Sequence, residues 1–455
     1  MTNPRKLTQL LLSTFVAVLV ASMPMFVSAM PQNDLDPDTQ FYVPRPNHGA
    51  VEQIADLTSS GNKEDADLIR AMIETPQAVW FTQGTPQSVQ QDVKNTVKRA
   101  AGKKTIPVLV AYNIPFRDCA QFSAGGATTV EEYLAWIDGF AAGIGSEPAI
   151  VILEPDGLGI IPWYKPFRGT SAQAGDYEWC RPAEANEATA ADERFEMLNY
   201  AVDALQAKPN VTVYLDGTHS GWLNVSDATH RLLQAGVARA DGFYLNVSNY
   251  HFTGNLVQYG TWISSCIALW PDSSTFVDCP NQYWNGGPLP SLVAQTVGEW
   301  QGIALDHFGQ WSDTDITFVG TPPDNDFMPL NTSAINLRYA NMLGSTVPTT
   351  HFVIDTSRNG QGPWQPPAGV YPDAQDWCNP PDRGLGLRPT ADTGNPLVDA
   401  YLWVKIPGES DGECTRGLGS TGTVDPEWGI VDPGAGQWFP EMALDLVHNA
   451  NPPLP

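Results

Sequence analysis

Strand patterns alternate with helix patterns along most of this chain, and that alternation limits the folds open to it. Strands are predicted at residues 78–81, 106–112, 149–153, 211–215, 242–246, 351–354 and 401–404. Helices are predicted at residues 64–73, 89–100, 130–144, 188–207, 227–235 and 289–308. This order is typical of an α/β fold with a parallel sheet and right-handed crossovers. Seven or eight such units favour a closed barrel, which places its chemistry at the carboxyl ends of the strands.

Two of these helices have recognisable N-cap residues. Thr129 precedes the helix at 130–144, and Glu132 stands at the capping-box position. Ser226 is the expected N-cap of the helix at 227–235.

The first 29 residues are expected to be a signal peptide. Arg5 and Lys6 precede an apolar run at residues 10–21, and small residues follow at 27–29. The run is short for a membrane span, which needs about 20 apolar residues, so a membrane anchor is the weaker alternative. Without a linker rich in Pro, Ser and Thr, residues 30–455 are expected to form one domain of a secreted, extracellular protein. No membrane contact is expected after cleavage.

The charge balance and the tryptophan content point to a neutral, ring-shaped substrate. The chain has 50 acidic and 24 basic residues, a surface that repels nucleic acid and anionic membranes. It also has 15 tryptophans, whose flat indole faces can stack on sugar rings. Some of them must lie in the core, but the excess favours a carbohydrate ligand.

Six cysteines, an even number, fit disulfides formed in an oxidising compartment. Their pairing is not fixed by sequence alone, although closeness in the chain favours Cys266–Cys279. No CxxC pair and no HExxH spacing occurs, so no metal is expected.

Acidic residues follow several of the predicted strands. They are Asp118, Asp156, Asp216, Asp355 and Asp411. One such residue alone is usually a helix cap or a turn residue. Clustered at one rim, carboxyl groups raise the pKa of the least solvated member, which can then act as a general acid. Glycoside hydrolysis requires such a pair. A calcium site is the alternative, but no loop has alternating Asp/Asn ligands.

Five segments resemble, in chain order, the signatures of glycoside hydrolase family 6, the cellobiohydrolase II and endoglucanase family. They are residues 112–119, 152–156, 214–222, 376–379 and 404–412. The resemblance extends over residues 38–452. It implies a distorted, partly open parallel β/α barrel with about seven strands. It also implies inverting hydrolysis of β-1,4-glucan, with cellulose and cello-oligosaccharides as substrates, no cofactor and a monomeric enzyme.

The resemblance implies roles for four catalytic residues. Asp156 matches the general acid, and Asp118 matches the carboxylate that raises its pKa. Tyr112 matches the tyrosine beneath the distorted sugar, and Asp411 the residue proposed as base. Alternatively, the attacking water passes its proton along a chain to Asp118, with Ser123 placing that water. Inversion requires the acid and base carboxyl groups to lie about 6.5–9.5 Å apart.

Further residues match binding and supporting positions. The sugar-stacking positions are Trp80, Trp222 and Trp377, for which core packing is the alternative. The hydrogen-bonding positions are His219, Asn249, Lys405, Glu409 and Asp216. Asp216 could instead be structural and orient His219 or Arg117, and Arg117 is expected to pair with carboxylates. Cys119–Cys180 and Cys378–Cys414 resemble the family's disulfides, tethering loops over the cleft.

The departures from the family pattern bear on the mode of action. Asn113 and Phe116 replace acids found in some members, and Val225 replaces a distal tryptophan of processive ones. Long segments at 163–183, 266–313 and 414–438 could roof the cleft, which favours a cellobiohydrolase that releases cellobiose from chain ends. An endoglucanase with an open cleft is the alternative. A non-catalytic glucan-binding barrel would have lost the carboxylates, which are all present.

Overall fold

The computed structural model describes residues 35–166, 177–271, 279–283, 304–313 and 330–455. The expected signal peptide at 1–29 lies outside the described residues. So does most of the helix predicted at 289–308, and the described part of that range, residues 304–308, is not helical. In the described part of the chain, no helix is both long enough and apolar enough to cross a membrane.

Seven parallel strands form one sheet, and they are ordered in space as they are in the chain. They are β1 (Val79–Phe81), β2 (Val108–Ala111), β3 (Ala149–Leu153), β4 (Val211–Asp216), β5 (Gly242–Leu245), β6 (His351–Asp355) and β7 (Val398–Leu402). Each strand pairs with the next in parallel register. The predicted α/β barrel is therefore confirmed.

The barrel is only partly closed. In the described chain no ladder joins β1 to β7. Two separate hydrogen bonds connect these edges: the Ala78 N–H donates to the Trp403 carbonyl at 2.9 Å, and the Trp80 indole Nε1 donates to the Val404 carbonyl at 2.8 Å. The structure thus has the partly open form implied by the family resemblance.

The strands form because their residues alternate between two apolar environments. In β2 and β3, Val108, Val110, Ile150 and Ile152 belong to the cluster inside the barrel. Their neighbours Leu109 and Val151 pack instead on the surrounding helices. A strand buried on both faces reads as a continuous β-branched run, which is why these strands were predictable.

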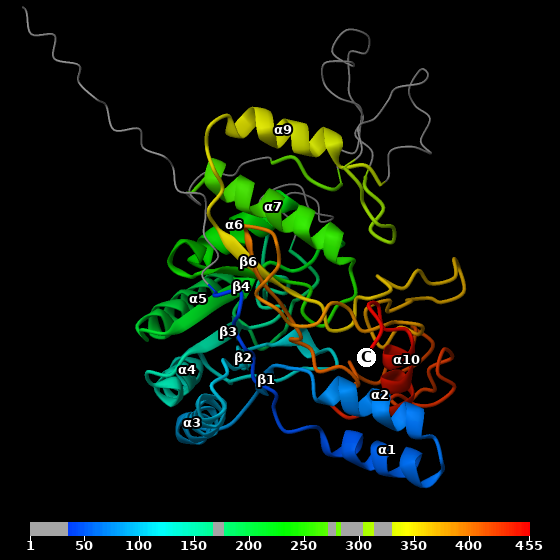
Figure 1. The fold of residues 1–455 in the computed structure, drawn as a ribbon. Helices are drawn as coiled ribbons and strands as arrows, with labels where there is room; N and C mark the ends of the chain where they lie inside the picture. Colours follow the sequence, from blue (N-terminus) through cyan, green and yellow to red (C-terminus); the bar gives the residue numbers. More distant parts are fainter. Residues whose placement is uncertain (1–34, 167–176, 272–278, 284–303, 314–329) are drawn as a thin grey trace, which may run out of the picture. The chain divides into compact units, whose positions relative to one another are not determined.

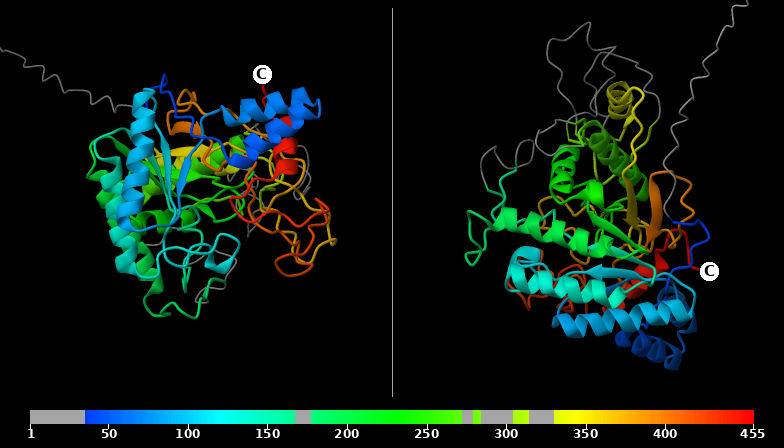
Figure 2. Two further views of the ribbon diagram at one scale, coloured as in Figure 1. Left: turned by 90° about the horizontal axis from the view of Figure 1, so that it is seen from below. Right: turned by 90° about the vertical axis from the view of Figure 1, so that its left-hand side faces the viewer.

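Nine α-helices of the described chain surround the sheet (Figures 1 and 2). They are α1 (His48–Ser59), α2 (Lys63–Ile73), α3 (Pro86–Gly102), α4 (Val130–Ile144), α5 (Ala190–Gln206), α6 (Val225–Gln234), α7 (Thr253–Leu269), α9 (Ser333–Leu343) and α10 (Pro440–His448). Helix α3 packs on α4 and α4 on α5 outside the first strands, whereas α1, α2 and α10 pack together at the side of β1 and β7.

The caps and one strand differ from prediction. The Thr129 side chain accepts from the Glu132 N–H as expected, but the Glu132 carboxylate bonds Thr128 rather than closing a capping box. Asn224, not Ser226, caps α6, because its Oδ1 accepts from the Asp227 N–H at 2.9 Å. Strand β7 begins at residue 398, three positions before the predicted start.

Candidate active site

A cavity of about 940 Å³ opens at the carboxyl ends of the strands. Most of the residues singled out from sequence line it. They are Trp80, Tyr112, Arg117, Asp118, Ser123, Asp156, His219, Trp222, Asn249, Trp377, Lys405, Glu409 and Asp411. The structure therefore brings together in one place residues that are spread over more than 300 positions of the chain.

Asp156 lies in the turn after β3, with a left-handed backbone (φ 61°). Glu154 anchors this turn to the end of β2, since its carboxylate accepts from the backbone N–H groups of Asn113 and Ile114 at 3.0 Å. Burial raises the pKa of Asp156 well above its usual value. The negative charges of Asp216 and then Asp118 raise that pKa further, so the surroundings favour the protonated form of the carboxyl group.

Asp118 begins a short 3-10 turn, Asp118–Ala120, with positive φ at all three residues. Such conformations are strained for residues with a Cβ and persist where surrounding contacts impose them. Here the Asp118 carboxylate accepts from the Ser123 N–H at 2.6 Å, and Cys119 is bonded to Cys180. Burial raises the pKa of Asp118 to about 6, although the Ser123 N–H and the Arg117 charge act against burial.

Arg117 was expected to pair with carboxylates, but its guanidinium binds backbone carbonyl groups instead. Its guanidinium donates to the carbonyl oxygens of Tyr112 at 2.5 Å, Thr82 at 2.8 Å and Ser123 at 2.9 Å. It also lies over the Tyr112 ring, 4.5 Å from the ring centroid. Arg117 therefore ties the loops after β1 and β2 together beneath the cavity.

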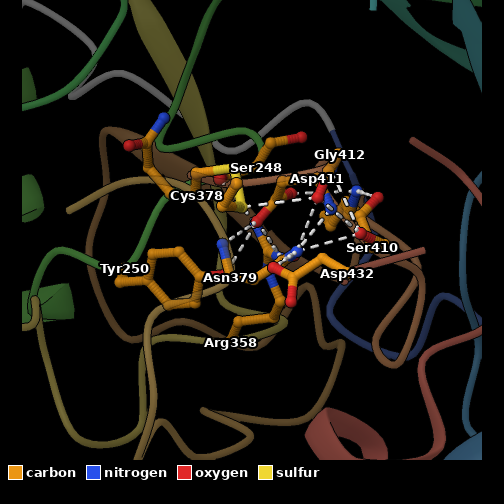
Figure 3. Close-up of polar contacts among 12 residues, drawn as sticks. Ser248, Tyr250, Arg358, Cys378, Asn379, Ser410, Asp411, Gly412 and Asp432 are labelled. Carbon is orange, nitrogen blue, oxygen red and sulfur yellow. Dashed lines mark hydrogen bonds and ion pairs between the residues drawn. A yellow bond between two sulfur atoms is a disulfide. The ribbon is translucent and has the colours of Figure 1, made fainter. Parts of the chain in front are cut away.

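The Asp411 carboxylate is held by two cations and two further hydrogen bonds, and Figure 3 shows its contacts with Arg358, Tyr250 and Asn379. Its carboxylate pairs with Arg358 at 2.9 Å and Lys405 at 3.0 Å. It also accepts from the Tyr250 hydroxyl and the Asn379 N–H, each at 3.1 Å. Burial alone would raise the pKa of Asp411, but the Arg358 and Lys405 charges lower it to about 2. The carboxylate is thus a fixed negative charge.

Arg358, Tyr250 and Asn379 are site residues that sequence reasoning missed. All three stand in segments that follow predicted strands or match a family signature, which was the available signal. Their partner Asp411 is 53 residues from Arg358 and 161 from Tyr250. Asn379 is itself held by Asp432, whose carboxylate accepts from the Asn379 side chain at 2.8 Å.

Asp216 lies behind the cavity wall and supports it. Its carboxylate accepts from the N–H groups of Leu158 and Gly159, both at 3.1 Å, and Thr218 at 2.8 Å. These are the contacts of a structural residue, and none of them is with His219 or Arg117. Burial raises the pKa of Asp216 to about 6, and its charge acts on Asp156.

Lys405, Glu409 and Asn249 are held by neighbouring groups at the rim. The Lys405 ammonium donates to the Ser410 carbonyl at 3.1 Å, and the Asn47 side chain donates to Glu409 at 2.8 Å. Asn249 donates to the Val247 carbonyl at 3.2 Å. Asp355, at the end of β6, accepts from the Lys405 N–H at 2.9 Å and organises this part of the rim.

Three tryptophans present part of their rings to the cavity. Trp80 packs edge-on against Tyr112, with centroids 5.4 Å apart. Trp222 lies against Gly159 and is 5.7 Å from the His219 ring. These two and Trp377 are half-buried and line the cavity, so none of them is a pure core residue.

Neutral histidines line one end of the cavity. The rings of His219 and His251 stack 4.2 Å apart, and His307 lies 6.0 Å from His251. Burial lowers the pKa of His219, and the neighbouring histidines lower it further. Only His219 was predicted, because His251 and His307 belong to no pattern recognised in the sequence.

Loops that follow β2, β6 and β7 meet at the cavity. Phe122, in the loop after β2, lies 6.0 Å from the Trp377 ring, centroid to centroid. It also contacts Gly412, where a Cβ would come within 2.4 Å of the Phe122 side chain. The disulfides Cys119–Cys180 and Cys378–Cys414 fix the two sides, and Cys266–Cys279 is also formed.

One cluster of possible metal ligands occurs among the described residues, at Cys414, Asp425 and Asp432. The Cys414 sulfur is bonded to Cys378, and Arg416 pairs with Asp425 at 2.7 Å. A disulfide sulfur is a poor ligand and the arginine supplies the compensating charge, so these residues do not make a metal centre.

The family model for glycosyl hydrolases family 6 matches residues 36–450. Endoglucanase 1 from Streptomyces halstedii is 31% identical over 96% of this chain and 98% of its own length. A probable 1,4-beta-D-glucan cellobiohydrolase C from Neosartorya fischeri is 27% identical over 84% of this chain and 71% of its own length.

A solved structure is similar throughout. The endoglucanase Cel6 from Mycobacterium tuberculosis, in complex with methyl-cellobiosyl-4-deoxy-4-thio-beta-D-cellobioside, superposes with a TM-score of 0.57. It is 29% identical and covers 90% of this chain and 97% of that one. The chain spans 63% of another relative, Endoglucanase A from Thermobispora bispora, which is 30% identical over 91% of this chain.

Proposed function

The chain belongs to glycosyl hydrolases family 6, and from this premise we propose that it hydrolyses β-1,4-glucan with inversion at the anomeric carbon. One observation carries the proposal: Asp156 and Asp411 line one cavity, and their surroundings raise the pKa of Asp156 and lower that of Asp411. Acid and anion at one glycosidic bond are what glycoside hydrolysis requires. The thio-linked cello-oligosaccharide bound by the relative from Mycobacterium tuberculosis supports the substrate class.

Asp156 acts as the general acid in the proposed reaction. Its proton passes to the glycosidic oxygen as the bond to the anomeric carbon breaks, and a water attacks that carbon from the opposite face. Tyr112 lies under the reacting sugar, and Trp80, Trp222 and Trp377 hold neighbouring sugars by stacking. His219, Asn249, Lys405 and Glu409 supply hydrogen bonds to hydroxyl groups at the rim.

The proton of the attacking water goes to Asp118 rather than to Asp411. A carboxylate with a pKa of about 2, bound by two cations, is a weak proton acceptor. Asp118, whose pKa is raised to about 6, accepts a proton far more readily and is still ionised near neutral pH. Ser123, whose N–H donates to the Asp118 carboxylate, guides the chain of water molecules that carries this proton from the attacking water to Asp118. Asp411 stabilises the positive charge that develops on the sugar.

The test replaces the proposed general acid and identifies the anomer of the wild-type product. Asp156→Asn should lose reducing-sugar release from cellulose by about two orders of magnitude or more, because the acid is removed, while substrate binding persists. NMR of the wild-type product within the first minutes should show the α-anomer. Unchanged turnover in the variant, or an initial β-anomer, would overturn the proposal. Loss of binding together with turnover would instead indicate damage to the site.

We also propose that the enzyme is secreted and acts as a monomer. Residues 1–29 serve as the signal peptide and residues 30–455 form one catalytic domain. Three disulfides support an oxidising destination.

For the mode of action, the proposal is release of cellobiose from chain ends. The contacts of Phe122 with Trp377 and Gly412 join separate loops at the cavity lining and support an enclosed path. Internal cutting is the second candidate, because the relatives that are at least 30% identical include proteins named endoglucanases.

Carboxymethyl cellulose separates the two modes. End-directed action should release cellobiose while viscosity falls slowly per bond cut. A steep early fall in viscosity, with few soluble products, would establish endo-action instead.

A further inference from the structure

Trp179 is the one tryptophan of the described residues that is exposed, with 53% of its surface accessible. It lines the catalytic cavity, although neither the strand pattern nor the family signatures single it out. Indole is costly to leave in water, so most tryptophans are largely buried. A half-exposed ring inside a binding cavity therefore indicates a ligand that covers it.

The residues on both sides of Trp179 are anchored, so the backbone that carries the exposed ring is held in place. Cys180 is bonded to Cys119, and its carbonyl accepts from the Trp163 N–H at 2.9 Å. Glu178 forms an ion pair with the fully buried Arg231, and its N–H donates to the Tyr164 carbonyl at 2.9 Å. A fixed platform binds more tightly than a mobile one, because less conformational entropy is lost.

The same anchors place this segment beside known parts of the site. Arg231 also donates to the Leu158 carbonyl at 2.8 Å, next to Gly159. Gly159 lies under the Trp222 indole, where a Cβ would meet the ring at 2.5 Å. On the other side, the disulfide joins the segment to the residue following Asp118. Trp179 is thus attached to the two walls that carry Trp222 and Asp118.

We propose that Trp179 is a further sugar platform, on which a glucosyl unit of the bound chain stacks beyond the units held by Trp80, Trp222 and Trp377. The ligand is a β-linked pyranose whose axial C–H groups face the indole, with its equatorial hydroxyl groups pointing to the sides. The proposal rests on the proposed function, since it concerns the same substrate. Only chains long enough to reach the segment at 177–180 gain from it.

The test measures binding against chain length in the Asp156→Asn background, with cellotriose to cellohexaose as titrants in calorimetry. Trp179→Ala should weaken binding of the longest oligosaccharide about tenfold, as expected for one buried aromatic contact, and leave the shortest unchanged. Trp179→Phe should retain part of the affinity. Tyr200→Ala removes an exposed aromatic residue on α5, which does not line the cavity, and should have no effect.

In the active enzyme, Trp179→Ala should raise KM for cellohexaose and leave kcat unchanged. Equal loss at every chain length, or none at any length, would overturn the role of Trp179. If the alanine variant does not fold, the phenylalanine variant carries the same comparison. Failure of the wild type to bind or cut any cello-oligosaccharide would sink the proposed function itself, and is thereby distinguished from failure of this site alone.

Discussion

Asp156 and Asp411 line one cavity, yet their pKa values move in opposite directions because their neighbours differ. Two cations lie against Asp411, whereas the charges nearest to Asp156 are carboxylates. Burial raises the pKa of both groups, and only paired cations overcome it. At the residue scale, the division of labour between acid and anion thus follows from the placement of Arg358 and Lys405.

Asp216→Asn should move the basic limb of the kcat/KM profile to lower pH. That limb reports the acid in the free enzyme, and Asp216 is the first of the charges that raise the pKa of Asp156. Asparagine keeps an oxygen to accept from the Leu158 and Gly159 N–H groups. Asp118→Asn, measured in parallel at its lower rate, should shift the limb less. If neither variant moves the basic limb, burial alone sets the pKa of Asp156.

Sequence identified single residues that follow strands, but not the contacts that such residues make with one another. Asp118 and Asp156 were predictable because each comes directly after an apolar strand, where barrels carry their chemistry. The pairing of Arg358 with Asp411 was not, because it depends on how two loops 53 residues apart fold onto each other. The hydrogen bonds of Arg117 to carbonyl groups were missed for the same reason.

At the element scale, helix α7 escaped prediction because it has no polar face. Its buried positions include Asn255, Ser264 and Ser265 as well as apolar residues, so the usual 3.6-residue alternation of polar and apolar side chains is lost. Strand β7 was placed three residues late, because the apolar run continues into the loop with Trp403 and Val404, which are also buried. A buried loop of apolar residues therefore has the same sequence pattern as a buried strand.

Phe122→Ala should remove the contacts that join the loop after β2 to the loops after β6 and β7. The side chain contacts Gly412, which follows β7, and lies beside Trp377, which follows β6. We expect viscosity of carboxymethyl cellulose to fall several-fold faster per reducing end released, because internal stretches of chain then gain entry. Phe122→Tyr keeps the ring and serves as the control. A ratio identical in all three proteins would mean that this contact does not close the path.

At the scale of the whole molecule, the order of strands and helices was enough to predict the parallel barrel. Strands that follow one another in the chain pair in the sheet, as consecutive elements usually do. The gap between β1 and β7 was not predictable from that pattern, which favoured closure. It depends on the last loops, where a hydrogen bond from Ala78 to Trp403 replaces a full ladder.

Stability should fall as pH rises from about 5 to 8. Burial raises the pKa values of Glu154 and Asp432 to about 7, and those of Asp118 and Asp216 to about 6. The folded protein therefore binds protons that the unfolded chain has released. The resulting stabilisation is complete below the ordinary carboxyl pKa of about 4 and is lost as pH passes 6 to 7.

Calorimetry at constant ionic strength should record a lower Tm at pH 8 than at pH 5. The net charge of −26 acts in the same direction, because self-repulsion grows as carboxyl groups ionise. Glu154→Gln should flatten the profile, since it removes one of the groups with a pKa near 7. A Tm that climbs between pH 5 and pH 8 would contradict the expected sign.

In the described chain, β1 and β7 are joined by single hydrogen bonds rather than by a ladder, and this has a consequence for an enzyme that cuts a polymer. In a fully closed barrel, a ladder of hydrogen bonds joins every pair of neighbouring strands. Widening such a barrel would break a whole ladder at once. Here the Ala78 and Trp80 contacts can part singly while six ladders stay intact. Trp80 donates one of those two bonds and also lines the cavity, so one side chain belongs both to this seam between β1 and β7 and to the wall of the groove. A glucan chain stacked on the Trp80 ring, as proposed above, would then lie against one of the two hydrogen bonds that join β1 to the loop after β7.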